Sequence, residues 1–260
     1  MTPSSTKAED LFQKILREAR VDANIIGFWL DGSRGKGIIS EHSDYDCTML
    51  VTDAVFDQYK ERYREFRTQD VELRVMTLAE FKSYAAWDSE TAWDRYNFAH
   101  LEPLVDRTGV LQELFQEKSR VPDNVRKAFV AGQWDYYVNQ VYRSLKCFRD
   151  GQIAGGRLEA AESVTPLLKA VFGLHGRVRP FFKYLDWELK AYPLENLAMP
   201  REGFLETILK ILETGSVPAQ QGLLTHMEVI ARADEYGDVF DAWGQKLAWM
   251  KNFVLISPQV

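Results

Sequence analysis

Two apolar segments separated by a glycine-rich turn constrain the fold of this chain more than any other feature. The first, residues 24–30 (NIIGFWL), leads into the turn sequence DGSRGKG at 31–37, and the second is residues 45–52 (YDCTMLVT). Short apolar runs bounded by turn residues are typical of buried strands. The glycines allow a tight change of direction between them. We therefore expect a strand, a glycine turn and a second strand.

The rest of the first half mixes helical and extended patterns. Leu11, Ile15 and Leu16 recur at helical spacing, and residues 56–66 place aromatic side chains at helical intervals. Residues 71–76 (VELRVM) alternate with a period of two, as a half-buried strand does. Residues 105–109 (VDRTG) indicate a strand that ends in a turn. These patterns predict a sheet with accompanying helices.

The second half is predicted to be almost entirely helical. Helical patterns cover residues 126–150, 156–174, 180–191, 201–214, 218–235 and 238–253. Proline and polar residues at 119–124 (SRVPDN) are typical of a boundary between domains. The sequence therefore predicts an α+β protein, with a mixed sheet and helices over residues 1–120 and an α-helical bundle over 121–260.

Composition excludes several classes of function. The net charge is −6, with 38 acidic and 32 basic residues, which argues against a partner bound through a nucleic-acid backbone. Cys47 and Cys147 are the two cysteines, too few for a disulfide framework or a four-cysteine zinc site. The first twenty residues lack a signal-peptide core, and no long apolar run occurs. We expect a cytoplasmic protein without a membrane partner; the sequence does not indicate its oligomeric state.

Asp44 and Asp46 are the first candidates for chemistry. On a strand, residues two apart point to the same side, so these carboxylates would lie about 7 Å apart along the backbone. Magnesium prefers such oxygen ligands, but an isolated pair of this kind is most often a solvated turn. The preceding turn favours the functional interpretation, because glycines let backbone N–H groups approach phosphate oxygens and Ser33 adds a hydroxyl donor.

The run from Gly32 to Asp46, GSRGKGIISEHSDYD, resembles the glycine-serine and aspartate-x-aspartate signature of the DNA polymerase beta-like nucleotidyltransferase superfamily. With a helical second half, the chain is similar to the small antibiotic nucleotidyltransferases that act on aminoglycosides. The resemblance implies a nucleotidyltransferase domain at 1–120 and a substrate-binding domain at 121–260. It also implies two Mg²⁺ ions and ATP or another nucleoside triphosphate as substrate.

The resemblance further implies a third carboxylate on a neighbouring strand, and Glu72 is our candidate. Alternation in DVELRV places Glu72 on the face opposite Val71, from which it can join Asp44 and Asp46 if the strands pair. Its role as metal ligand or as base stays open, as does the alternative that it simply faces water. Some relatives take the base from the helical domain, where Arg157, Glu159 and Glu162 are candidates for substrate binding. Glu159 and Glu162 share a helix face.

Nucleotide binding is predicted for a further set of residues. A departing pyrophosphate requires positive charge, which Arg34 and Lys36 in the turn or Lys183 and Arg179 in the helical half could supply. The residues predicted to bind the nucleotide are Gly32, Ser33, Arg34, Lys36, Ser43 and Lys183, with Arg179 assigned to the substrate.

The predicted function is Mg²⁺-dependent transfer of a nucleoside monophosphate, AMP from ATP, to a hydroxyl of a small molecule, with an aminoglycoside-type antibiotic as one acceptor. The alternative is a non-catalytic nucleotide-binding regulatory or antitoxin-like protein. The acceptor, the hydroxyl modified and the preferred nucleobase are not specified by the sequence.

Overall fold

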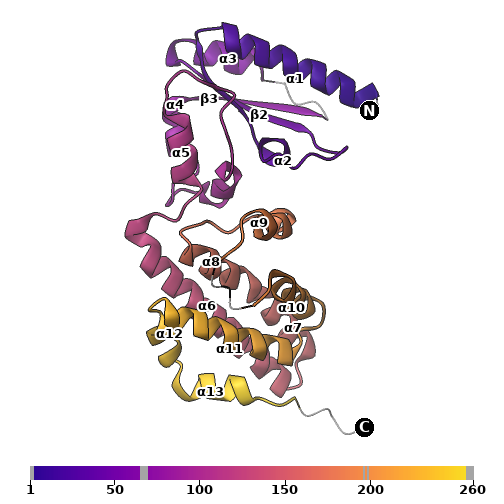
Figure 1. Ribbon diagram of the computed structural model, residues 1–260, viewed down its shortest axis with the longest axis vertical. Coiled ribbons are helices and arrows are strands. Elements are labelled where there is room, and N and C mark those ends of the chain that lie inside the picture. The colour runs from indigo at the N-terminus through magenta and orange to yellow at the C-terminus, as the bar shows by residue number, and fades with distance from the viewer. Residues whose placement is uncertain (1–2, 65–69, 196, 198, 256–260) are drawn as a thin grey trace. The chain divides into compact units, whose positions relative to one another are not determined.

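The computed structural model describes residues 3–64, 70–195, 197 and 199–255. The chain divides into two compact units, Met1–Val121 and Pro122–Val260, coloured from indigo to magenta and from magenta to yellow in Figure 1. The first contains a mixed sheet with helices, and the second is helical. The predicted α+β class is therefore confirmed.

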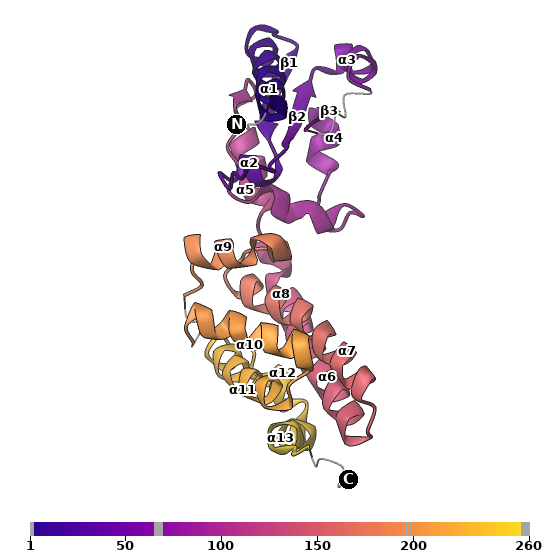
Figure 2. The same ribbon diagram turned by 90° about the vertical axis from the view of Figure 1, so that its right-hand side faces the viewer.

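A four-stranded sheet forms the centre of the first unit. Its strands are β1 (Ile25–Leu30), β2 (Tyr45–Val51), β3 (Val71–Thr77) and β4 (Val105–Asp106), in the order β3-β2-β1-β4. β1 pairs antiparallel with β2 and with β4, whereas β2 and β3 are parallel. The sheet brings the end of β1 and the starts of β2 and β3 to the same edge (Figure 2).

Helices cover both faces of this sheet. One face packs against α1 (Pro3–Val21) and α3 (Phe56–Arg62), through Phe12, Ile15 and Tyr59. The opposite face packs against α4 (Leu78–Ser83), the 3-10 helix η2 (Ala92–Phe98) and α5 (Leu111–Lys118). A further 3-10 turn, η1 (Asp53–Val55), precedes α3. Both faces of the central strands are thus buried, which explains their nearly continuous apolar sequences.

The helices α4 and α5 are absent from the sequence prediction. Thr77 and Glu80 form a capping box at the start of α4: Thr77 Oγ1 accepts from the Glu80 backbone N–H at 3.1 Å, and a Glu80 carboxylate oxygen accepts from the Thr77 N–H at 2.9 Å. This Thr-x-x-Glu pattern is a recognisable start signal. α4 could therefore have been predicted from sequence.

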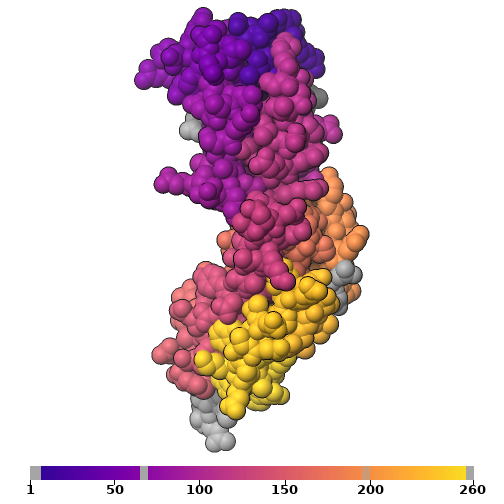
Figure 3. Space-filling model, turned by 90° about the vertical axis from the view of Figure 1, so that its left-hand side faces the viewer, coloured from indigo at the N-terminus to yellow at the C-terminus, as the bar shows by residue number. Residues whose placement is uncertain are grey.

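The second unit is built around the long helix α6. Its helices are α6 (Asp123–Arg149), α7 (Ile153–Glu162), α8 (Val164–Leu174), α9 (Leu185–Ala191), α10 (Arg201–Thr214), α11 (Val217–Ala233), α12 (Gly237–Asp241) and α13 (Gly244–Asn252), with the 3-10 turn η3 (Phe182–Tyr184) before α9. These helices enclose one apolar core. α12 and α13, yellow in Figure 3, lie on the outside of the unit and contribute Phe240, Leu247 and Met250 to that core.

Two segments expected to be single helices are each interrupted. The predicted helix 156–174 is divided at Ser163, because Pro166 has no N–H to donate to the carbonyl of Glu162. The predicted helix 238–253 is divided between α12 and α13, where Gly244 adopts a φ of +47°. No helix within the described residues is both long enough and apolar enough to cross a membrane.

Candidate functional site

One face of the sheet changes from apolar to acidic along its strands. Leu50 of β2 and Met76 of β3 stand side by side in the apolar cluster under α4 and α5. Two residues toward the shared edge, Thr48 pairs with Arg74. Two residues further, Asp46 stands directly opposite Glu72. Because alternate residues share a face, the sheet register itself places the two carboxylates together at the edge.

The glycine turn closes over this edge. Its first part forms a single helical turn, α2 (Gly32–Gly35), immediately after β1, and the backbone N–H of Asp31 donates to the Asp46 carbonyl at 2.7 Å. Gly32 has a φ of +60°, and a Cβ atom at this position would lie 2.9 Å from Oδ2 of Asp46. Glycine at position 32 therefore permits both the backbone conformation and the close approach of the Asp46 carboxylate.

Gly35 presses the turn against the end of β1. A Cβ atom here would lie 2.1 Å from the carbonyl oxygen of Leu30 and 2.7 Å from Cδ2 of Leu101. Leu30 pairs with Cys47 of β2, and its carbonyl is part of the backbone, so no rotation of a side chain moves it aside. The absence of a side chain at position 35 thus sets the distance between the turn and the sheet.

Ser33 and Ser43, both predicted to bind nucleotide, are brought together. The Ser33 hydroxyl donates to the Ser43 hydroxyl at 3.2 Å, and Ser43 Oγ also accepts from the Ser40 backbone N–H at 2.9 Å. Arg34 Nε donates to the Ser43 carbonyl at 3.0 Å, and its guanidinium stacks 3.7 Å from the ring centre of Tyr45. These contacts join the glycine turn to the segment that enters β2.

The three predicted metal ligands lie at the same edge of the sheet. Asp46 and Glu72 are partly buried on paired strands, which lie about 4.8 Å apart in a typical sheet. Asp44 is exposed, two residues before Asp46. Within the part of the chain that the structure describes, no three His, Cys, Asp or Glu side chains are gathered into a metal-binding cluster. The donor set nevertheless fits Mg²⁺, which proteins commonly hold with one or two carboxylates and the phosphates of the substrate.

The Lys36 side chain is buried against the segment 96–99. Its side chain is only 7% exposed, and Nζ donates to the carbonyl oxygens of Tyr96, Asn97 and Ala99 at 3.2, 2.8 and 2.5 Å. An ammonium group has three N–H donors, which these three carbonyls match in number. In the structure Lys36 therefore holds the segment 96–99, in contrast to the prediction that it binds the triphosphate.

Asp31 is a buried carboxylate that the sequence interpretation did not assign to the site. It accepts from Trp29 Nε1 at 2.8 Å, from Thr48 Oγ1 at 2.6 Å and from Asn97 Nδ2 at 3.3 Å. Burial raises its pKa to about 6, against the opposing effect of the hydrogen bonds from Thr48 and Trp29. In the sequence, only its position directly before Gly32 pointed to a role at the site. In the structure, the Asp31 carboxylate connects the start of the turn to β1, β2 and the segment around Asn97.

The raised pKa of Asp31 predicts a pH-dependent contribution to stability. A carboxyl whose pKa rises from 3.8 to about 6 on folding stabilises the folded state at low pH, and this contribution is lost as pH rises through that range. Between pH 4.5 and 7 the loss should be about 2 kcal/mol. Asp31→Asn should remove this pH dependence. Urea unfolding of the wild type and of the variant at both pH values measures the effect. If the unfolding free energy changes with pH by the same amount in the two proteins, the assignment to Asp31 is wrong.

The predicted substrate-binding residues belong to the second unit. Glu159 and Glu162 share a face of α7 and contact α6, where Arg143 Nε donates to Glu159 at 2.9 Å and the Tyr136 hydroxyl donates to Glu162 at 3.0 Å. Arg157 instead donates to the carbonyl of Glu213 at the end of α10. The structure thus brings the two glutamates together and separates Arg157 from them.

Arg179 and Lys183, the cations of this unit predicted to supply charge for the pyrophosphate, lie in the segment that leads into α9. Arg179 Nη1 donates to the Pro180 carbonyl at 2.7 Å, and its guanidinium lies 4.7 Å from the ring centre of Phe182. Burial lowers the pKa of Arg179. Lys183 is exposed, with Nζ 4.7 Å from the ring centre of Tyr184. Both side chains are therefore positioned by aromatic neighbours.

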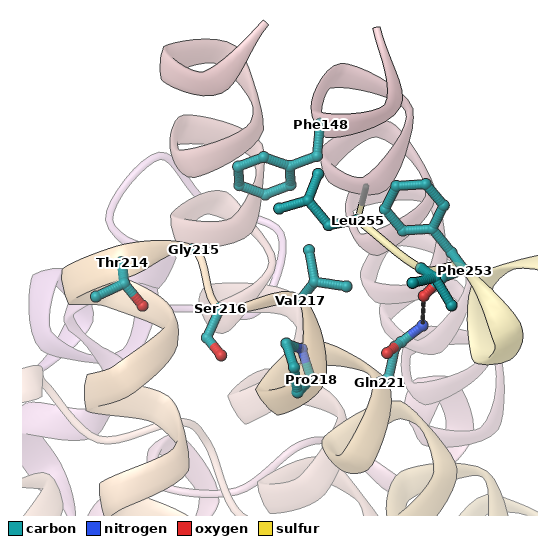
Figure 4. Close-up of a pocket in the computed structure, with 10 residues that line it drawn as sticks. Phe148, Thr214, Gly215, Ser216, Val217, Pro218, Gln221, Phe253 and Leu255 are labelled. Atoms are coloured by element: carbon teal, nitrogen blue, oxygen red, sulfur yellow. Dashed lines mark hydrogen bonds between the residues drawn. The ribbon is translucent and has the colours of Figure 1, made fainter. Parts of the chain in front are cut away.

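A pocket of about 550 Å³ occurs elsewhere in the second unit, and none of the predicted site residues lines it. Its wall is mainly apolar, with Phe148, Val217 and Phe253 facing the space in Figure 4. Gln221 Nε2 donates to the carbonyls of Met250 and Phe253, both at 2.8 Å, and so fixes the C-terminal wall. The residues that line the pocket all belong to the second unit, whereas the acidic edge of the sheet belongs to the first.

The chain was compared with protein families, with curated proteins and with solved structures. No protein-family model matches the chain, and no curated protein matches it. Among solved structures, the chain is similar to the crystal structure of a nucleotidyltransferase-like protein from Exiguobacterium sibiricum 255-15. That likeness covers 94% of this chain and 87% of the other, with 12% sequence identity and a TM-score of 0.40.

Proposed function

We propose that this chain is a magnesium-dependent nucleotidyltransferase, which transfers AMP from ATP to a hydroxyl group of a small molecule and releases pyrophosphate. One observation carries the proposal: Asp46 and Glu72 stand in direct register on neighbouring strands, beside a turn whose glycine lets the Asp46 carboxylate approach. A partly buried carboxylate pair at the edge of a sheet, next to a glycine-serine turn, suits a triphosphate bound with a divalent cation.

Each residue of the edge has a part in this proposal. Asp44 and Asp46 would hold Mg²⁺, which when bound activates the attacking oxygen and stabilises the charge of the departing pyrophosphate. The hydroxyls of Ser33 and Ser43, which lie 3.2 Å apart, can both donate to phosphate oxygens. Arg34, held by Ser43 and Tyr45, supplies positive charge at the turn.

The transfer itself exchanges one phosphorus–oxygen bond for another. The acceptor oxygen bonds to the α-phosphorus, the bond from that phosphorus to the pyrophosphate oxygen breaks, and the acceptor proton passes to a base. We propose Glu72 as the base because it stands directly beside Asp46 in the sheet. The proposed acceptors are aminoglycoside-type polycations, whose binding the net charge of −6 favours.

Pyrophosphate release from ATP tests this function. The purified protein is incubated with ATP, Mg²⁺ and a panel of streptomycin, kanamycin and lincomycin type compounds, and pyrophosphate and adenylylated product are both measured. We expect pyrophosphate and product in equal amounts with at least one acceptor, and loss of both when EDTA removes the metal. Repeating the assay with GTP, CTP and UTP establishes the nucleobase preference.

The same measurements separate the enzyme from the non-catalytic alternative. A regulatory or antitoxin-like protein would bind ATP, measured by calorimetry, yet release no pyrophosphate with any acceptor of the panel. That combination would contradict the proposed function. Metabolites with free hydroxyl groups belong in the same panel, because a transferase with a metabolite acceptor would be inactive toward every antibiotic.

A further inference from the structure

The glycine turn is tied to a segment of the chain about sixty residues later. Lys36 is the last cation of the turn, and its buried Nζ donates to the carbonyls of Tyr96, Asn97 and Ala99. The ring of Tyr96 also lies 4.8 Å from Nζ. Buried carbonyl groups are costly without hydrogen-bond partners, so the ammonium group fixes the backbone of residues 96–99 next to the turn.

Asn97 faces the turn from this fixed segment. Its Oδ1 accepts from the backbone N–H of Gly32 at 3.4 Å, and its Nδ2 donates to Oδ1 of Asp31 at 3.3 Å. The two bonds define the orientation of the carboxamide, because a flipped amide would set an NH₂ group against the Gly32 N–H. Asn97 thus bridges the backbone N–H of Gly32 and the buried carboxylate of Asp31.

This bridge matters because of the conformation of Gly32. Gly32 has a φ of +60° and no side chain that could restrict its backbone. Glycine loses more conformational freedom on ordering than any other residue. A partner that orders the turn before the nucleotide arrives reduces the entropy lost on binding.

We propose that Asn97 is a positioning residue for the phosphate-binding turn and that Lys36 holds Asn97 in place. Asn97 orients the Gly32–Ser33 backbone for the triphosphate, and Lys36 acts through the 96–99 carbonyls and not on the phosphates. The identity of the ligand rests on the proposed function, whereas the ordering of Gly32 does not.

Two measurements on the full chain test the proposal. Hydrogen exchange of the Gly32 backbone amide, followed by NMR without nucleotide, reports the order of the turn. Calorimetric titration with ATP and Mg²⁺, at a temperature well below unfolding, reports nucleotide affinity. For Asn97→Ala we expect faster Gly32 exchange and about 10-fold weaker ATP binding, the effect of the lost hydrogen bond to Gly32. The lost bond to Asp31 should lower the unfolding midpoint modestly, which does not affect a titration made well below that midpoint.

Lys36→Met and Asn24→Ala complete the design. Lys36→Met should give the same changes at Gly32 and in ATP affinity, together with a lower urea midpoint; if this variant does not fold, Asn97→Ala decides alone. Asn24 lies at the other end of β1, where its side chain contacts Asp22, so Asn24→Ala should match the wild type in both measurements.

The outcomes distinguish this inference from the proposed function. Unchanged Gly32 exchange in Asn97→Ala would overturn the bridge, whether or not the protein binds ATP. Faster exchange with unchanged or tighter ATP binding would overturn the positioning role, because a merely structural contact would leave the affinity of the folded protein intact. A wild-type protein that binds no ATP would instead overturn the proposed function, while the exchange measurement would still decide whether Asn97 orders the turn.

Discussion

Replacing Asp46 by Asn is expected to reduce Mg²⁺-dependent pyrophosphate release by about 1,000-fold, because the variant loses a metal-binding charge worth several kcal/mol in the transition state. Asn has nearly the same size as Asp, so the close packing of residue 46 against Gly32 is preserved. The rate at saturating ATP, together with a thermal unfolding curve, checks both statements.

Asp44→Asn should have a similar effect, and the double variant should be little worse than either single variant. Groups that act as one unit in catalysis are strongly non-additive. Asp57→Asn, on the exposed surface of α3, is the matched control and should retain wild-type activity. An Asp46→Asn protein with more than a tenth of wild-type activity would show that this carboxylate does not hold the metal.

Gly35→Ala is expected to destabilise the first unit by about 4 kcal/mol, the range of severe core substitutions. The new methyl carbon would lie 2.1 Å from the Leu30 carbonyl oxygen, an overlap that rotation of a side chain cannot relieve. Either α2 moves away from the sheet or β1 loses its pairing. Because α2 carries Ser33, we expect the residual folded protein to lose nucleotide affinity as well. Urea denaturation at neutral pH measures the stability change.

Gly37→Ala is the control for backbone strain. Gly37 has a φ of +73°, but a Cβ atom there would meet nothing within 4 Å. The substitution should therefore cost about 1 kcal/mol, the penalty of a left-handed conformation alone. Equal destabilisation by the two substitutions would mean that contact with Leu30 is not the reason for glycine at position 35.

The strands of the sheet could be predicted from sequence because their signals are local. The apolar runs 24–30 and 45–52 and the alternating run 71–76 correspond to β1, β2 and β3 within one or two residues. Alternation also predicted that Glu72 faces away from Val71, and the register places it opposite Asp46. Short helices are harder to recognise, since α5 offers only Leu111, Leu114 and Phe115 as its periodic apolar residues.

The polar support of the site could not be predicted, because its contacts connect distant parts of the chain. Nothing near Lys36 in sequence indicates that its ammonium group meets carbonyls at 96–99, and a basic residue in a glycine turn ordinarily suggests a phosphate. Asp31 likewise becomes a buried acceptor only when Thr48 and Asn97 reach it. The catalytic, metal-binding and substrate-binding roles themselves stay predictions that the experiments above address.

Under the proposed function, the direct pairing of Asp46 with Glu72 would make activity depend on the correct strand register. A slip of one residue between β2 and β3 would turn Glu72 toward the face packed against α1 and α3 and set Val71 or Leu73 beside Asp46. Such a molecule would bury a carboxylate in an apolar layer and lose its acidic pair in the same step. Misaligned chains should therefore be inactive and not merely impaired. If the proposed activity holds, an active-site titration would count the correctly aligned molecules in a preparation.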